Sequence, residues 1–189
     1  MLLVHGIDDT SRVFKKMKKF LEERGFKVAL IDLFPSNGDA PLQVLAGQVK
    51  SFIENNFGKK LKIQIVAFSM GGIVCRYYLQ RMGGIKRVRR FITISTPHKG
   101  TVTARLRREK GAVQMRRNSK FLNDLNKDVK KLRGVDFVSM WTPLDLMIFP
   151  ATSSKMNIGK EFSFPVIVHP LMLRSKKVME KIAELLAMP

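Results

Sequence analysis

Short runs of hydrophobic residues alternate along this chain with stretches in which hydrophobic residues recur every three or four positions. The short runs, rich in β-branched residues, predict buried strands, and the periodic stretches predict amphipathic helices. The predicted strands fall within residues 2–4, 28–33, 63–68, 87–96, 135–141 and 162–168. The predicted helices cover residues 10–24, 42–57, 73–82 and 175–186, with Thr10 or Ser11 capping the first and Gly25 ending it.

Strands that alternate with helices are typical of βαβ units, which build a parallel sheet with helices on both faces. The chain is therefore predicted to be an α/β protein, a single domain over residues 1–189. Pro165 interrupts the last predicted strand and places it near a sheet edge. Ligands bind such sheets at the carboxyl ends of the strands, where His5, Ser69 and residues 95–98 are expected to meet.

The alternation breaks between residues 99 and 133, which we call the basic segment. It holds twelve Lys or Arg residues against three acidic ones. Its arginines concentrate in one part of it: Arg105, Arg107, Arg108, Arg116 and Arg117. Two interpretations stay open here. The segment is either a surface excursion that carries solvated charge or a cap over the site with a basic outer face.

The stretch IQIVAFSMGG, residues 63–72, contains a serine between a buried strand and a helix. This fits the nucleophile elbow G-x-S-x-G, with Ala67 in place of the first glycine. The turn strains the backbone at Ser69 and needs nearly side-chain-free residues two positions away on each side, which Ala67 and Gly71 are. The alternative is an ordinary strand–turn–helix with a capping serine.

A serine hydroxyl needs a base to take its proton. The elbow architecture orders nucleophile, acid and histidine along the chain, and His169 is the histidine that fits. Asp145 is the single carboxylate between residues 138 and 161 and is the predicted acid. Asp145 as a turn cap, His169 as a structural histidine and His98 as the base remain alternatives.

The oxyanion of the reaction needs two donors. The elbow predicts the backbone N–H of Met70 as one and that of Ile7, in the loop after the first strand, as the other. No metal or other cofactor is expected, because the three histidines lack ligand spacing with one another or with Cys75.

Charge and cysteine content add expectations about partners and location. The net charge of +20 predicts attraction to polyanions, such as an anionic membrane surface. Nucleic acid is not expected as a partner, since zinc-finger spacing and RNA-recognition signatures are missing. A single cysteine, no apolar run of membrane-spanning length and no evident signal peptide predict a cytoplasmic protein, peripheral at a membrane at most.

The segments LLVHGIDDT, VAFSMGG, ISTPHKGT and WTPLDLMI, with a terminal strand ending in His, resemble the small bacterial lipases and esterases of the α/β-hydrolase fold. The resemblance runs from Leu2 to Leu186. It implies a minimal fold of about six mostly parallel strands, with the basic segment inserted before the acid-bearing strand. It also implies the nucleophile Ser69, the acid Asp145 and the base His169, with Ile7 and Met70 as oxyanion donors. Two departures from the family pattern are Phe68, where many lipases carry His, and His169-Pro170 in place of G-H-x-G.

These features predict a serine carboxylic-ester hydrolase that acts on a small or lipid ester through an acyl-enzyme on Ser69. Two alternatives remain open. An acyltransferase would use the same three residues and a different acceptor, and a basic membrane- or nucleic-acid-binding protein would carry them as a vestigial site.

Overall fold

Residues 1–188, which the computed structural model describes, form one six-stranded sheet in the order β2-β1-β3-β4-β5-β6. Every neighbouring pair of strands is parallel, which confirms the predicted α/β fold. The strands are β1 (Leu2–Val4), β2 (Ala29–Ile31), β3 (Ile63–Phe68), β4 (Val88–Ile94), β5 (Asp136–Trp141) and β6 (Lys160–Ser163).

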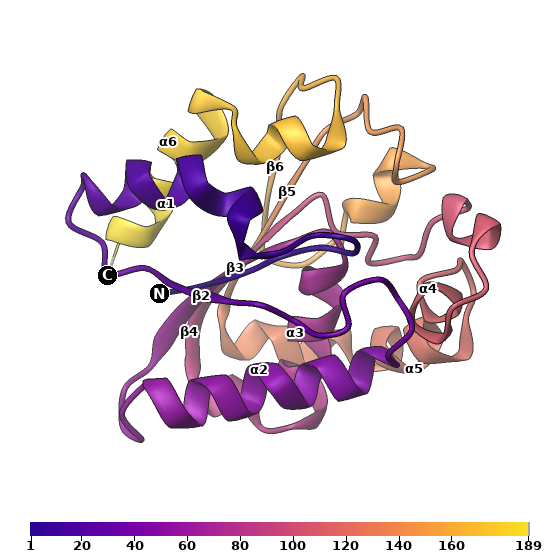
Figure 1. Ribbon diagram of the computed structural model, residues 1–189, viewed down its shortest axis with the longest axis horizontal. Helices are drawn as coiled ribbons and strands as arrows, with labels where there is room; N and C mark the ends of the chain where they lie inside the picture. The colour runs from indigo at the N-terminus through magenta and orange to yellow at the C-terminus, as the bar shows by residue number, and fades with distance from the viewer. Residues whose placement is uncertain (189) are drawn as a thin grey trace.

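Helices cover both faces of the sheet (Figure 1). Their bounds are α1 (Lys15–Glu22), α2 (Leu42–Asn56), α3 (Met70–Arg81), α4 (Lys110–Gln114), α5 (Lys120–Lys127) and α6 (Lys176–Ala187). On one face α1 packs against α6, and on the other α2 and α5 pack against α3. No helix within residues 1–188 is long and apolar enough to cross a membrane.

The central strand β3 is buried on both of its faces. Ile65 belongs to the core under α2 and α3, whereas Val66 belongs to the core under α1 and α6. A strand covered on both sides needs apolar residues at consecutive positions rather than at alternate ones. This is why the stretch before Ser69 is an unbroken hydrophobic run.

Two local predictions were wrong. Thr10 and Ser11 do not cap α1 with their side chains. A 3₁₀ turn, Ser11–Phe14, precedes that helix, and Ser11 donates its amide and hydroxyl to Asp32 instead. The last strand ends at Ser163 rather than at residue 168, because Pro165 has no N–H to donate to the sheet. His169 consequently starts a 3₁₀ helix, His169–Leu173, and is not the end of a strand.

The basic segment contains α4, α5 and short 3₁₀ turns. Its attachment to α3 depends on Arg76, whose side chain is fully buried. The guanidinium donates to the carbonyls of His98 and Leu125 and to the side-chain oxygens of Gln80 and Asn126. Burial lowers the pKa of Arg76 to about 9, so the group stays protonated at neutral pH. One cation thus joins α3, α5 and the loop after β4.

We expect Arg76→Met to lower the free energy of unfolding by about 2–4 kcal/mol, because buried acceptors would lose a charged donor. Arg81→Met is a matched control on the same helix. Arg81 pairs with Asp124 and Asp128 at the surface, so its loss should cost about 1 kcal/mol or less. Urea unfolding of both variants measures the difference. Equal losses would contradict the role assigned to Arg76.

Candidate active site

Ser69 occupies a strained turn between β3 and α3. Its φ of 51° and ψ of −122° lie in a region that residues with a side chain rarely adopt. Gly71 makes the turn possible, because a Cβ there would lie 2.7 Å from the carbonyl oxygen of Val4 and closer still to that of His5. The predicted strand–turn–helix is therefore present, and its geometry is that of an elbow rather than of a capping serine: the Ser69 side chain makes no capping hydrogen bond to α3.

Asp145 and His169, which are 24 residues apart, form a buried pair. Nδ1 of His169 donates to Oδ2 of Asp145 across 2.7 Å. Oδ1 of the same carboxylate accepts from the amides of Met147 and Ile148, at 3.0 and 2.9 Å. Carboxylate oxygens accept hydrogen bonds, so this contact places a ring proton at Nδ1 and leaves Nε2 as the nitrogen that can act on the serine. The pair orients the imidazole as a general base requires.

Phe68 holds this histidine beside the elbow. The rings of Phe68 and His169 lie with their centroids 4.7 Å apart, and Phe68 directly precedes Ser69. Nε2 of His169 is buried and has no hydrogen-bond partner among residues 1–188. Catalytic hydrogen bonds often tighten only when substrate is bound. Phe68, which stands where many lipases carry His, thus packs against the candidate base. The linear pattern did not reveal this contact.

The predicted oxyanion donors flank Ser69. Met70 is the first residue of α3, so its N–H has no acceptor within the helix. Ile7 lines the same cavity as Ser69. The loop that carries it lies against the elbow, since a Cβ on Gly6 would come within 3.0 Å of Cβ of Ser69. Both amides therefore lie on segments that converge on the serine.

Within residues 1–188, neither of the other two histidines forms a hydrogen bond to a carboxylate. His5 donates from Nδ1 to the carbonyl of Gly6 and accepts at Nε2 from the amide of Leu33, each at 2.8 Å. His98 is buried with Nε2 3.1 Å from the hydroxyl of Thr93. Burial and the charges of Arg76 and Lys99 hold the pKa of His98 well below its usual range. His98 therefore lacks the partner that would support it as a base.

A cavity of about 290 Å³ opens at Ser69. Its walls are mainly apolar and include Ile7, Ala104, Leu106, Met115, Leu146 and Ile148. Three of these belong to the basic segment, which therefore forms part of the wall of the cavity instead of standing clear of the site. An apolar cavity next to a nucleophile suits an acyl chain.

Arg107 ties the basic segment to the loop of Ile7. Its guanidinium binds the carboxylate of Asp8, with Nη2 3.3 Å from Oδ1, and donates to the carbonyl of Asn37 at 2.6 Å. It also pairs with Glu109. Asp8 has a φ of 58° and sits at the cavity. This contact could not be predicted from the sequence, since nothing in the linear pattern relates residues 99 positions apart.

A further carboxylate, Asp9, packs beside Gly6 near the elbow. Burial raises the pKa of Asp9, and the nearby His5 and His169 oppose that change. Asp9 therefore interacts electrostatically with both of these histidines. Among residues 1–188, no three His, Cys, Asp or Glu side chains gather closely enough to hold a metal ion.

Comparison with known proteins adds a family to this geometry. The family model described as palmitoyl protein thioesterase matches residues 1–115, a stretch that includes Ser69 but ends before Asp145 and His169. Lysosomal thioesterase PPT2 from Bos taurus is 33% identical over 106 residues, which cover 53% of this chain and 34% of the relative. PPT2 from Homo sapiens is 32% identical over the same coverage. The match thus spans about a third of the length of these relatives.

Similar solved structures extend over nearly the whole chain. The mature Bacillus licheniformis lipase BlEst2 superposes with a TM-score of 0.82 at 17% identity, covering 99% of this chain and 91% of that one. Aspergillus fumigatus lipase B gives a TM-score of 0.80 at 16% identity, covering 99% of this chain and 52% of that one. At such identities the likeness shows the fold, which confirms the predicted α/β-hydrolase architecture. The family follows from the matched residues 1–115, which are more than half of the sequence: the chain belongs to the palmitoyl protein thioesterase family.

Proposed function

We propose that the protein is a serine hydrolase that cleaves acyl esters and thioesters through an acyl-enzyme. The observation that carries the proposal is the buried imidazole of His169, held by Asp145 on one side and packed on Phe68 beside Ser69 on the other. Membership of a thioesterase family extends the expected leaving groups from alcohols to thiols.

The geometry supports a specific role for each of these residues in the reaction. Nε2 of His169 takes the proton of Ser69 Oγ as that oxygen attacks the acyl carbonyl. The backbone N–H groups of Ile7 and Met70 stabilise the oxyanion. The imidazolium then protonates the leaving alkoxide or thiolate, which leaves an acyl group on Ser69. His169 next activates a water molecule, and the acid is released as the hydroxyl of Ser69 is restored.

The apolar cavity supports a preference for an acyl chain. Each methylene buried there should contribute about 0.8 kcal/mol, or roughly fourfold in kcat/KM, until the cavity is full. At about 290 Å³ it lies at the small end of ligand-binding pockets. The gain should therefore stop at a medium chain length.

The test is hydrolysis of nitrophenyl esters and of matched acyl thioesters over a range of chain lengths. We expect turnover of both classes, rising with chain length to a plateau. A fluorophosphonate probe should label Ser69, located by peptide mapping. A folded protein that neither reacts with the probe nor hydrolyses any member of either series would refute the proposal and favour a vestigial site.

A further inference from the structure

The surface around the mouth of the Ser69 cavity exposes large apolar side chains. Leu106 is 87% exposed and Leu146 80% exposed, and both line the cavity. A shallow depression next to it is lined by Leu144, Leu146, Phe149 and Ile167. Leu146 belongs to both hollows, so the exposed side chains form one continuous patch. We call the set Leu106, Leu144, Leu146, Met147, Phe149 and Ile167 the apolar rim.

The apolar rim is held in place by its backbone. Thr101 accepts the amide of Phe149 at 2.9 Å, and the carbonyl of Phe149 accepts the amide of Val102 at 2.9 Å. Thr103 donates to the carbonyl of Met147 at 2.7 Å. The loop after β5 thus presents its apolar side chains outward from an ordered frame. A fixed apolar patch beside charged residues marks an interaction surface.

Exposed positive charges flank this patch. Arg105 and Arg108 lie on either side of Leu106 in the sequence, and both are exposed. Two other arginines of the basic segment do not contribute in this way. Arg107 is neutralised by Asp8 and Glu109, and half-buried Arg116 donates to the carbonyls of Ala104 and Arg107. Asp8 is far from Arg107 in the sequence, so only the structure shows that it helps to neutralise this arginine.

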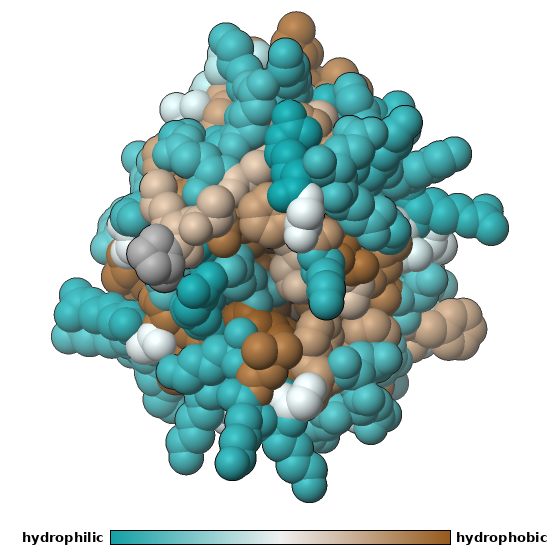
Figure 2. Space-filling view, turned by 90° about the vertical axis from the view of Figure 1, so that its left-hand side faces the viewer, coloured by the Kyte–Doolittle hydropathy of each residue, from teal (hydrophilic) through white to brown (hydrophobic). Residues whose placement is uncertain are grey.

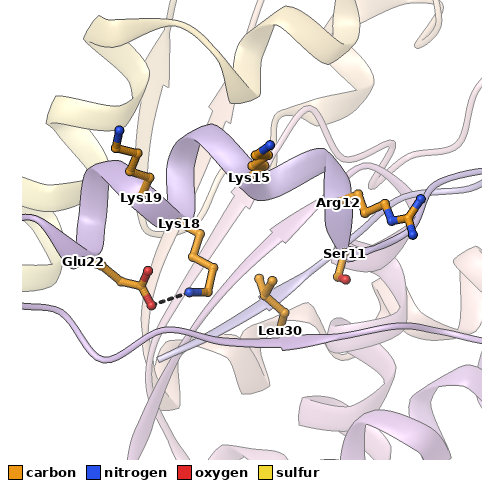
Figure 3. Close-up of a pocket in the computed structure, with 7 residues that line it drawn as sticks. All are labelled: Ser11, Arg12, Lys15, Lys18, Lys19, Glu22 and Leu30. Carbon is orange, nitrogen blue, oxygen red and sulfur yellow. Dashed lines mark hydrogen bonds and ion pairs between the residues drawn. The ribbon is translucent and has the colours of Figure 1, made fainter.

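Charge alone does not single out this side of the molecule. Figure 2 shows the left-hand side of the molecule as it is seen in Figure 1, where hydrophilic side chains project over most of the surface. A basic groove of about 480 Å³ also lies between α1 and β2, lined by Arg12, Lys15, Lys18 and Lys19. In it Lys18 reaches Glu22 at 2.5 Å, while Lys15 and Lys19 point away from Leu30 (Figure 3). That groove offers little apolar surface for insertion.

We propose that the apolar rim inserts into an anionic membrane surface, with Arg105 and Arg108 at the level of the lipid head groups. The proposal rests on the proposed function and deepens it, because the cavity would open directly onto the acyl chains of the bilayer. A second copy of this chain is a poorer partner for the apolar rim, since two molecules of charge +20 repel each other. An anionic bilayer complements both the apolar patch and its charges.

Cosedimentation with vesicles of phosphatidylcholine and phosphatidylserine tests the insertion. Phe149→Ser and Ile167→Ser each remove an exposed apolar side chain that does not line the Ser69 cavity. Each should weaken binding about tenfold, because the side chain no longer leaves water for hydrocarbon. Leu61→Ser is the matched control. Leu61 is also exposed, but it precedes β3 and so lies at the opposite end of that strand from Ser69. It should bind like the wild type.

The charge contribution has its own matched pair. Arg105→Glu with Arg108→Glu should weaken binding at least fivefold for each contact, on the order of 1 kcal/mol per cation at the membrane. Lys59→Glu with Lys60→Glu changes the net charge equally at the end of β3 remote from Ser69, and should weaken binding less. The oriented insertion is wrong if the arginine pair and the lysine pair weaken vesicle binding equally. It is also wrong if Leu61→Ser weakens vesicle binding as much as the rim variants do.

Hydrolysis of a soluble short-chain ester by the same preparations separates this proposal from the proposed function. The rim variants should hydrolyse it within about twofold of the wild type. If the wild type hydrolyses the ester but does not bind the vesicles at low salt, the membrane proposal is wrong and the proposed function is unaffected. Size-exclusion chromatography tests a second alternative. If the wild type is a dimer that the rim substitutions dissociate, and it does not bind vesicles, the surface is an interface with a second copy and the membrane proposal is wrong.

Discussion

Ser69→Ala is expected to lower kcat/KM for a soluble ester by about 10⁵- to 10⁶-fold, while the protein stays folded. The reason is that alanine removes the attacking oxygen and nothing else: the turn between β3 and α3, the cavity and both predicted oxyanion donors remain. Residual hydrolysis above that in water should come from binding and the oxyanion donors. Steady-state kinetics and thermal unfolding of the variant measure both parts of the prediction.

Ser95→Ala is a suitable control for this change. Ser95 follows the neighbouring strand β4, has a φ of 43° and is buried, so it shares the unusual backbone of Ser69 without a place in the proposed chemistry. We expect its kcat/KM to stay within about tenfold of the wild type. If Ser69→Ala kept most of the activity, the nucleophile would have to be another residue.

His169→Ala should cause a loss as large as that of Ser69→Ala, because nucleophile and base act as a unit. Asp145→Asn should lower kcat by about 10⁴-fold, since an amide would favour the wrong tautomer of the imidazole. Both expectations depend on the 2.7 Å hydrogen bond between the two side chains. Single-turnover kinetics should show that both formation and hydrolysis of the acyl-enzyme slow, because His169 is the base in each step.

His98→Gln tests the alternative base. His98 is bound to Thr93 and faces the charge of Arg76, so its replacement should reduce stability more than it reduces turnover. Activity that disappears in His98→Gln but survives in His169→Ala would reverse the assignment of the base.

Local signals were enough to predict the framework of the site. The apolar run of β3 appears in the sequence because both faces of that strand are buried. The small residues around Ser69 appear because the elbow leaves no room for side chains, as the crowding at Gly71 shows. Asp145 and His169 could be selected from the order of residues along the chain, although His169 starts a 3₁₀ helix rather than ending a strand. Such features are visible in the sequence because the residue type at each position is constrained by the local backbone and by neighbours along the chain.

Contacts between distant segments were decided only by the tertiary structure. The packing of Phe68 on His169, the pair of Asp8 with Arg107 and the assembly of the apolar rim from residues 106 to 167 each join parts of the chain that share no local pattern. The sequence by itself determined which residues could do chemistry and which elements would carry them. The structure decided which side chains meet and which apolar ones stay exposed, because both depend on how the loops at the carboxyl ends of the strands pack together.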